Sequence, residues 1–258
     1  MILFVFEGKK PEMALFEAID SLLLHIGNEK IVTTFHTNFY KLYDEIQKDE
    51  DVLTLNLLKE WLWTKNNHSL DEYSTDDFTE IYLFFDYDLH AATSFLHLTT
   101  DDANHRVKEM LQIFNDEYEH GKLFVSYPMI ESYLYTKKMP DSDFSSYTYK
   151  IADLANFKSD TNAFSDYTQN QFTTAHTKLE NWAKAIMQNV YKANFLCKGQ
   201  YSMPLAKDDI TQANIFDCEV SQYVVPNAEV SILCALPLFV HYYLRPELFD
   251  ERILSHIH

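Results

Sequence analysis

Strand-like apolar segments alternate with helical patterns through the first half of the chain, and this alternation restricts the fold more than any other property of the sequence. The four segments are Ile2–Phe6, Glu29–Phe35, Ile81–Phe85 and Lys122–Ser126. Continuous apolar runs of β-type residues are typical of strands that are buried on both faces of a parallel sheet. Strands that alternate with helices predict right-handed βαβ units. We therefore expect an α/β fold in which a mainly parallel four-stranded sheet is flanked by helices.

The pattern changes after residue 137, where no further strand of the parallel type is evident. We expect residues 1–137 to form one domain, with a helical insertion near residues 38–77. Residues 138–258 are expected to form an all-helical C-terminal subdomain. The helical patterns in this half cover residues 172–195, 208–218 and 228–243.

The charge of the chain limits how it could bind nucleic acid. Its 258 residues include 39 acidic and 21 basic side chains, which gives a net charge of −18. Broad basic patches are the usual electrostatic signature of nucleic-acid binding, and this composition disfavours them. Chemistry on nucleic acid would then need metal ions, a local lysine cluster or a basic partner. The three arginines are Arg106, Arg245 and Arg252.

Cysteine usage and hydropathy indicate a cytoplasmic protein that does not enter the membrane. The 3 cysteines show neither a CxxC pair nor zinc-like spacing, which favours free thiols in a reducing compartment. The apolar stretch Val230–Leu244 is shorter than the ~20 residues that a membrane span requires, so we expect a core helix there.

Three acidic residues follow predicted strands, and they are the main candidates for chemistry. Glu7 follows the first strand, and Asp86 and Asp88 follow the third. Ligands of open parallel sheets bind at the carboxyl ends of the strands, where these side chains would meet. Carboxylates suit Mg²⁺ or Mn²⁺, so the pattern predicts a metal site. The alternative is a set of solvated acids in an acidic protein.

Two short motifs resemble a known family. Val5-Phe6-Glu7-Gly8-Lys9 and Leu83-Phe84-Phe85-Asp86-Tyr87-Asp88 look like the Toprim domain of topoisomerases, DnaG-type primases and OLD-family nucleases. The segment Lys122–Glu131 is similar to one in small stand-alone Toprim proteins of OLD-like defence systems, which are often paired with an ABC-type ATPase. The resemblance covers about residues 1–137. Glu7 and Asp86 are 79 positions apart (86 minus 7), more than in a minimal Toprim domain, which implies an insertion between them.

The resemblance implies a role for each matching residue. Glu7 would be a metal ligand or general base, and Asp86 and Asp88 would be metal-binding aspartates. Glu131 would be the extra carboxylate that holds a second metal, although an acid near a helix that starts at Pro128 also has a structural explanation. Candidates for phosphate or substrate contacts are Lys9, Lys10, His90, Lys122 and Ser126, of which Lys122 could equally be an ordinary lysine at a strand start and His90 a packing residue.

The function implied is an Mg²⁺- or Mn²⁺-dependent nuclease that hydrolyses phosphodiester bonds of DNA or RNA. The resemblance also implies an effector of a phage-defence system that works with an ABC-type ATPase partner, with tRNA or invading DNA as candidate substrates. A homo-oligomer is left open. The alternatives are a non-catalytic Toprim-like binding or regulatory module and a HAD-type phosphatase, which also uses an Asp-x-Asp motif but normally places it after the first strand.

Overall fold

A computed structural model describes the chain except for residues 9–10, 49–53, 66, 119 and 258. Strands β1 (Ile2–Phe6), β2 (Lys30–Thr34), β3 (Glu80–Asp86) and β4 (Lys122–Ser126) form one sheet in the order β2-β1-β3-β4. All three pairings in this sheet are parallel, with Ile2 opposite both Lys30 and Glu80. The expected parallel four-stranded sheet is confirmed.

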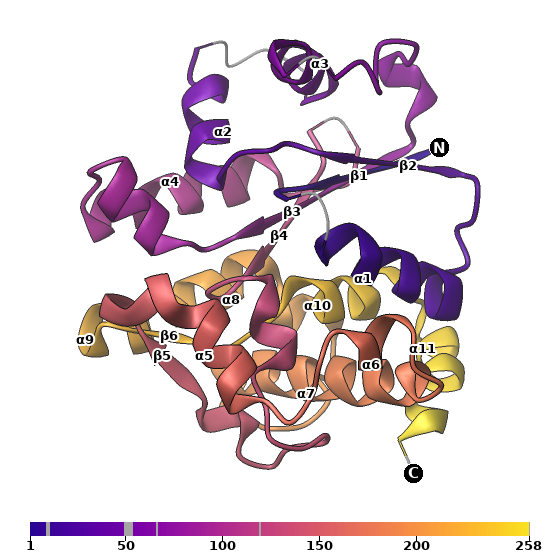
Figure 1. The fold of residues 1–258 in the computed structure, drawn as a ribbon, viewed down its shortest axis with the longest axis vertical. Coiled ribbons are helices and arrows are strands. Elements are labelled where there is room, and N and C mark those ends of the chain that lie inside the picture. The colour runs from indigo at the N-terminus through magenta and orange to yellow at the C-terminus, as the bar shows by residue number, and fades with distance from the viewer. Residues whose placement is uncertain (9–10, 49–53, 66, 119, 258) are drawn as a thin grey trace.

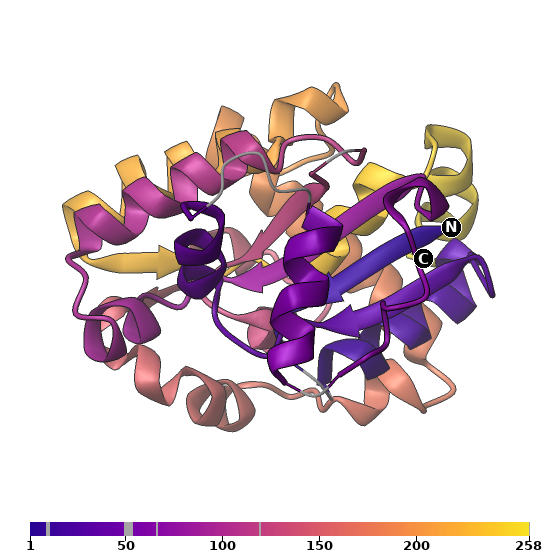
Figure 2. The ribbon, with the colours of Figure 1, turned by 90° about the horizontal axis from the view of Figure 1, so that it is seen from above.

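Helices cover both faces of the sheet (Figure 1). Helices α1 (Pro11–Ile19) and α10 (Ala235–Tyr243) lie below it in that view. Helices α2 (Phe39–Ile46) and α3 (Thr54–Thr64) lie above it, within residues 38–77, where helices were expected. Helix α4 (Thr100–Ile113) is drawn to the left of the sheet and packs against α2. Figure 2, viewed from the α3 side, shows the strands running in one direction beneath these helices.

The side chains of alternate strand residues build two apolar layers, as the pleat of a strand requires. On one face, Phe239 of α10 packs edge-on against Phe4, Phe84 and Phe124, with ring centroids 5.2 to 5.7 Å apart. On the other face, Phe85 packs against Phe39 of α2 at 5.9 Å. Because α10 belongs to the C-terminal half, the buried core runs without a break across residue 137.

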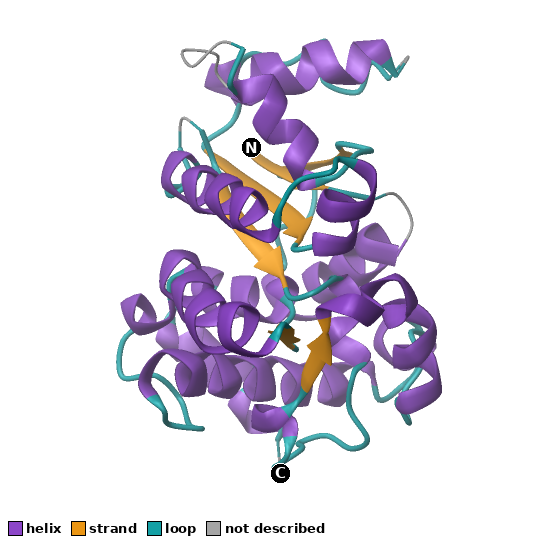
Figure 3. Cartoon of the chain, turned by 90° about the vertical axis from the view of Figure 1, so that its left-hand side faces the viewer, coloured by secondary structure: helices purple, strands orange, loops and turns teal. Residues whose placement is uncertain are grey.

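The remaining elements are mostly helical, and they include one small antiparallel ladder between β5 (Thr148–Lys150) and β6 (Glu229–Ser231). Figure 3 shows this ladder among the helices of the C-terminal half. Among the described residues no helix is both long and apolar enough to cross a membrane. The other α-helices are α5 (Phe157–Phe164), α6 (Asn170–Thr173), α7 (Lys178–Lys198), α8 (Gln212–Glu219), α9 (Val225–Asn227) and α11 (Pro246–Arg252).

The ladder corrects the expectation of an all-helical C-terminal part and of a helix over residues 228–243. Ala228 has a positive φ of 53°, which ends α9 and lets Glu229–Ser231 extend alongside β5. Leu233 then forms an isolated bridge with Tyr127, so α10 begins only at Ala235. A short apolar run gives the same signal for a buried strand as for a buried helix, which explains the wrong prediction.

Candidate functional site

The carboxyl ends of β1 and β3 meet where the strand order reverses. The chain passes from β1 to β2 on one side and then crosses back over β1 to form β3 on the other. Open α/β sheets bind ligands at such switch points. Glu7 lies directly after β1, and its Oε2 accepts a hydrogen bond from the Asp86 N–H at 3.1 Å. Its own N–H donates to the Phe84 carbonyl at 3.1 Å, so Glu7 is held across both strands.

Asp88 continues this edge beyond β3. The Tyr87 N–H donates to the Ser126 carbonyl at 2.9 Å, which extends the pairing with β4, and the Tyr87 side chain is buried. Asp88 is half-buried, and its Oδ1 accepts the Ala91 N–H at 3.0 Å. This bond fixes the carboxylate at the start of the π-helical turn Ala91–Phe95.

A fourth carboxylate, Glu12, enters the site from the first turn of α1. Its Oε1 accepts the Gly8 N–H at 3.1 Å. A side chain at position 8 would place its Cβ only 2.8 Å from Glu12 Oε1, so a glycine allows this close approach. Glu12 is 8% exposed, and its Oε2 is buried without a hydrogen-bond partner among the described residues. Buried carboxylate oxygens are seldom left unpaired, so the expected partner of this atom is a proton or a bound cation.

The fifth carboxylate, Glu131, follows β4 and forms an ion pair with a lysine. It lies in the 3-10 turn Ile130–Leu134, which begins two residues after Pro128, so the helix start predicted at Pro128 is wrong. Lys158 of α5 reaches Glu131 with a 2.6 Å ion pair. In the part of the chain that is described, this is the one ion pair between a lysine or arginine and any of the five carboxylates.

Burial and mutual repulsion raise the pKa values of this cluster. Burial is the largest cause for Glu7, whose pKa rises to about 8 despite the hydrogen bond from Asp86, and the charges of Asp88 and Glu12 add to the shift. Burial also raises the pKa of Asp86 well above its ordinary value, with further contributions from Glu7 and Glu131. The pKa values of Glu12 and Asp88 are raised mainly by burial as well. Such a cluster favours binding of a proton or another cation.

The oxygen donors fit a hard divalent cation, although no closed cage is formed. Among the described residues, no group of three or more His, Cys, Asp and Glu side chains is arranged so that it could hold a metal ion. Mg²⁺ is commonly held by one or two carboxylates together with waters and substrate phosphate oxygens. The unpaired Oε2 of Glu12 and the Glu7–Asp86 pair therefore suit Mg²⁺ or Mn²⁺ in that mode.

The other predicted contact residues are divided between the two edges of the sheet. His90 lies beside Asp88, and its charge lowers the pKa of that carboxyl. Ser126 ends β4 at the same edge, but its Oγ accepts the Ala235 N–H at 3.2 Å at the start of α10. Lys122 starts β4 at the opposite edge, where its Nζ donates to the Asn115 carbonyl at 2.9 Å. The predicted contacts Lys9 and Lys10 lie outside the described residues.

Sequence reasoning missed Glu12, Lys158 and Tyr40. Tyr40 of α2 is fully buried, its hydroxyl has no described hydrogen-bond partner, and its pKa is raised by burial and by the charges of Asp88 and Glu7. Glu12 could have been found from the sequence, because it is an acid in the first turn of the helix that follows Gly8 and the first strand. No local pattern distinguishes Lys158 or Tyr40.

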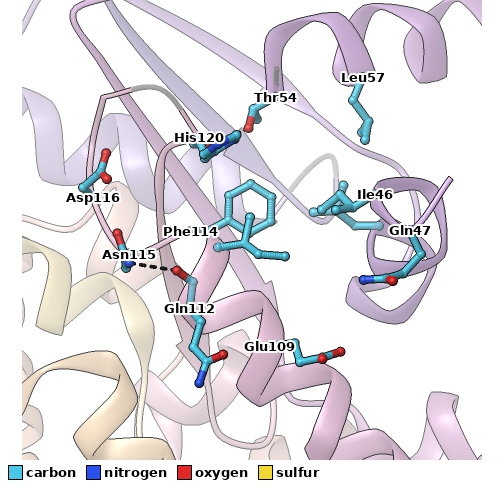
Figure 4. A pocket seen from close by; sticks show the side chains of 12 residues that line it. Ile46, Gln47, Thr54, Leu57, Glu109, Gln112, Phe114, Asn115, Asp116 and His120 are labelled. Atoms are coloured by element: carbon cyan, nitrogen blue, oxygen red, sulfur yellow. Dashed lines mark hydrogen bonds between the residues drawn. The ribbon is translucent and has the colours of Figure 1, made fainter. Parts of the chain in front are cut away.

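A pocket of about 570 Å³ lies elsewhere, between α2, α3 and α4 (Figure 4). It is lined by His120 and Asn115, which precede β4, so it lies toward the amino ends of the strands. None of the five carboxylates lines it.

No protein-family model, no curated protein and no solved structure matches the chain.

Proposed function

We propose that this protein is an Mg²⁺-dependent nuclease that hydrolyses phosphodiester bonds of DNA or RNA at the switch point of its sheet. The observation that carries the proposal is the meeting of five half-buried or buried carboxylates from separate parts of the chain, with one described lysine paired to them. Structural ion-pair networks balance acids with bases, whereas this cluster has an excess of negative charge. That excess is the expected property of a site that holds divalent cations.

Each residue has a task in the proposed reaction. Glu7 and Asp86 would contact one ion, with waters and substrate oxygens completing its shell and Asp88 adding negative charge beside it. Glu12 with Glu131 would provide oxygens for a second ion. When bound, Mg²⁺ would lower the pKa of a water and offset negative charge on the substrate phosphate.

Lys158 would bind the substrate phosphate. Its ammonium contacts Glu131 at 2.6 Å, and its pKa is raised by that hydrogen bond and also by the charges of Glu12 and Asp86. It therefore stays protonated at neutral pH and can move between the carboxylate and a phosphate oxygen. The resemblance to Toprim defence proteins supports an effector role beside an ABC-type ATPase.

The direct test measures metal-dependent cleavage. The protein is incubated with plasmid DNA, mixed RNA or a chromogenic phosphate ester in the presence of Mg²⁺ or Mn²⁺. Each reaction is repeated with any ATPase that a neighbouring gene encodes. We expect cleavage of a nucleic acid, no turnover of the ester, and loss of activity in Asp86→Asn and in excess EDTA. Asp76→Asn, an exposed aspartate, is the matched control. Undiminished cleavage in Asp86→Asn or in EDTA contradicts the proposal, and turnover of the ester alone favours the phosphatase alternative.

A further inference from the structure

Phe95 is a large apolar side chain that lies in solvent close to the carboxylates. It is 70% exposed, although Ala91 and Ala92 in the same turn are buried. The turn begins at Ala91, whose N–H donates a hydrogen bond to Asp88. Phe95 therefore lies at the same edge of the sheet as the candidate metal ligands. Isolated exposed apolar residues are common, and position alone does not give Phe95 a role.

The π-helical geometry joins Phe95 to His90. Their ring centroids are 5.5 Å apart and the rings are nearly perpendicular, at 81°. In an α-helix the neighbours on one face are three or four residues apart, so residues five apart would not meet. The wider turn, closed by the Leu96 N–H to the Ala91 carbonyl at 3.3 Å, brings the two rings together. Single π-helical turns are frequent at functional sites.

The His90 ring is itself oriented. Its Nδ1 lies 3.1 Å from the Ser94 Oγ, within hydrogen-bond distance. His90 follows Asp88 by two positions, just before the turn that Asp88 caps. The edge of the candidate site therefore carries a fixed pair of rings, with most of the Phe95 surface open to solvent.

We propose that Phe95, supported by His90, stacks against a nucleobase next to the scissile phosphate, and that the substrate presents this base unpaired. This inference rests on the proposed nuclease function and adds the substrate class, a single strand or a loop of nucleic acid. A chain with net charge −18 gains little from long-range attraction to phosphates, whereas stacking on an aromatic ring does not depend on charge. Bases within a duplex hide their faces from such a ring, and unpaired bases expose them.

The test compares Phe95→Ala with wild type on one oligonucleotide, single-stranded and annealed to its complement. We expect KM for the single strand to rise roughly 5- to 100-fold while kcat changes little, since stacking contributes to binding of the base. Phe95→Trp should keep the wild-type KM because it retains a ring. The salt dependence of binding should be the same in Phe95→Ala as in wild type, because no phosphate contact is removed. Tyr118→Ala, at a 66% exposed tyrosine before β4, is the control.

A second readout is independent of cleavage. The fluorescence of a 2-aminopurine oligonucleotide should be quenched by wild type and not by Phe95→Ala. Equal KM and equal quenching in the two proteins would overturn the stacking role, and equal cleavage of duplex and single strand would overturn the substrate class. Quenching by wild type without cleavage of any nucleic acid would instead refute the proposed nuclease function while leaving the stacking contact supported.

Discussion

Replacement of Glu7 by glutamine should stabilise the protein when no divalent cation is present. Burial raises the pKa of Glu7 to about 8 from an ordinary value of 4.5. The folded state therefore binds more protons than the unfolded state between these values, and stability falls as the pH rises through this window. At pH 7 the linkage relation gives a cost of about 3 kcal/mol in the free energy of unfolding. Glutamine removes this cost and can still accept the Asp86 N–H.

The same variant should lose stabilisation by Mg²⁺. A ligand at 100 times its Kd stabilises the folded state by about 2.7 kcal/mol, so saturating Mg²⁺ should nearly remove the advantage of Glu7→Gln over wild type. At pH 4.5 the difference without Mg²⁺ should fall below about 0.5 kcal/mol, because Glu7 is then mostly protonated in the folded state.

Chemical denaturation at pH 4.5 and pH 7, with EDTA or with Mg²⁺, measures all of these differences. Glu72→Gln, at an exposed glutamate, is the control and should match wild type in every condition. Calorimetry in two buffers adds the number of protons released when Mg²⁺ binds, which should be smaller in Glu7→Gln. The reasoning is refuted if the free energy of unfolding of wild type does not fall, relative to that of Glu7→Gln, between pH 4.5 and pH 7. It is also refuted if Mg²⁺ stabilises both proteins equally.

Two further predictions concern the core and the lysine of the site. Phe239→Ala should destabilise the protein by about 3–5 kcal/mol, since a fully buried ring is removed, and the unfolding midpoints reported by Trp61 and Trp182 should shift together. A shift of the Trp182 midpoint alone would show that the C-terminal half unfolds independently. Lys158→Met should tighten Mn²⁺ binding roughly two- to fivefold, because a competing cation is removed, whereas Glu131→Gln should weaken it. Titration calorimetry measures both, and the same direction of change in the two variants would contradict a shared site.

The sheet and part of the site were predictable because their signals are local. Buried parallel strands appear as continuous apolar runs, and the predicted segments Ile2–Phe6 and Lys122–Ser126 coincide with β1 and β4. Glu7, Asp86 and Asp88 follow from the rule that acids at strand ends share one edge of a parallel sheet.

The missing parts depend on long-range packing. Lys158 approaches Glu131 only because α5 packs against the turn Ile130–Leu134, and nothing near either residue in the sequence indicates this. Strand β6 exists because β5, some 80 residues earlier, provides its partner, with Thr148 opposite Ser231. The local sequence Glu229–Ser231 has no turn signal of the hairpin type that would have indicated a strand.

The packing of α10 against the sheet determines how far the chain could be shortened. Phe4, Phe84 and Phe124 are buried on the face where Phe239 packs, and α10 is formed by residues 235–243. A fragment that ends near residue 137 would keep the five carboxylates, but it would lose Lys158 and leave these rings facing water. Contiguous exposed apolar surface of this kind promotes association between molecules. Recombinant production of the N-terminal half alone should therefore yield aggregates, and a minimal active fragment has to extend through α10.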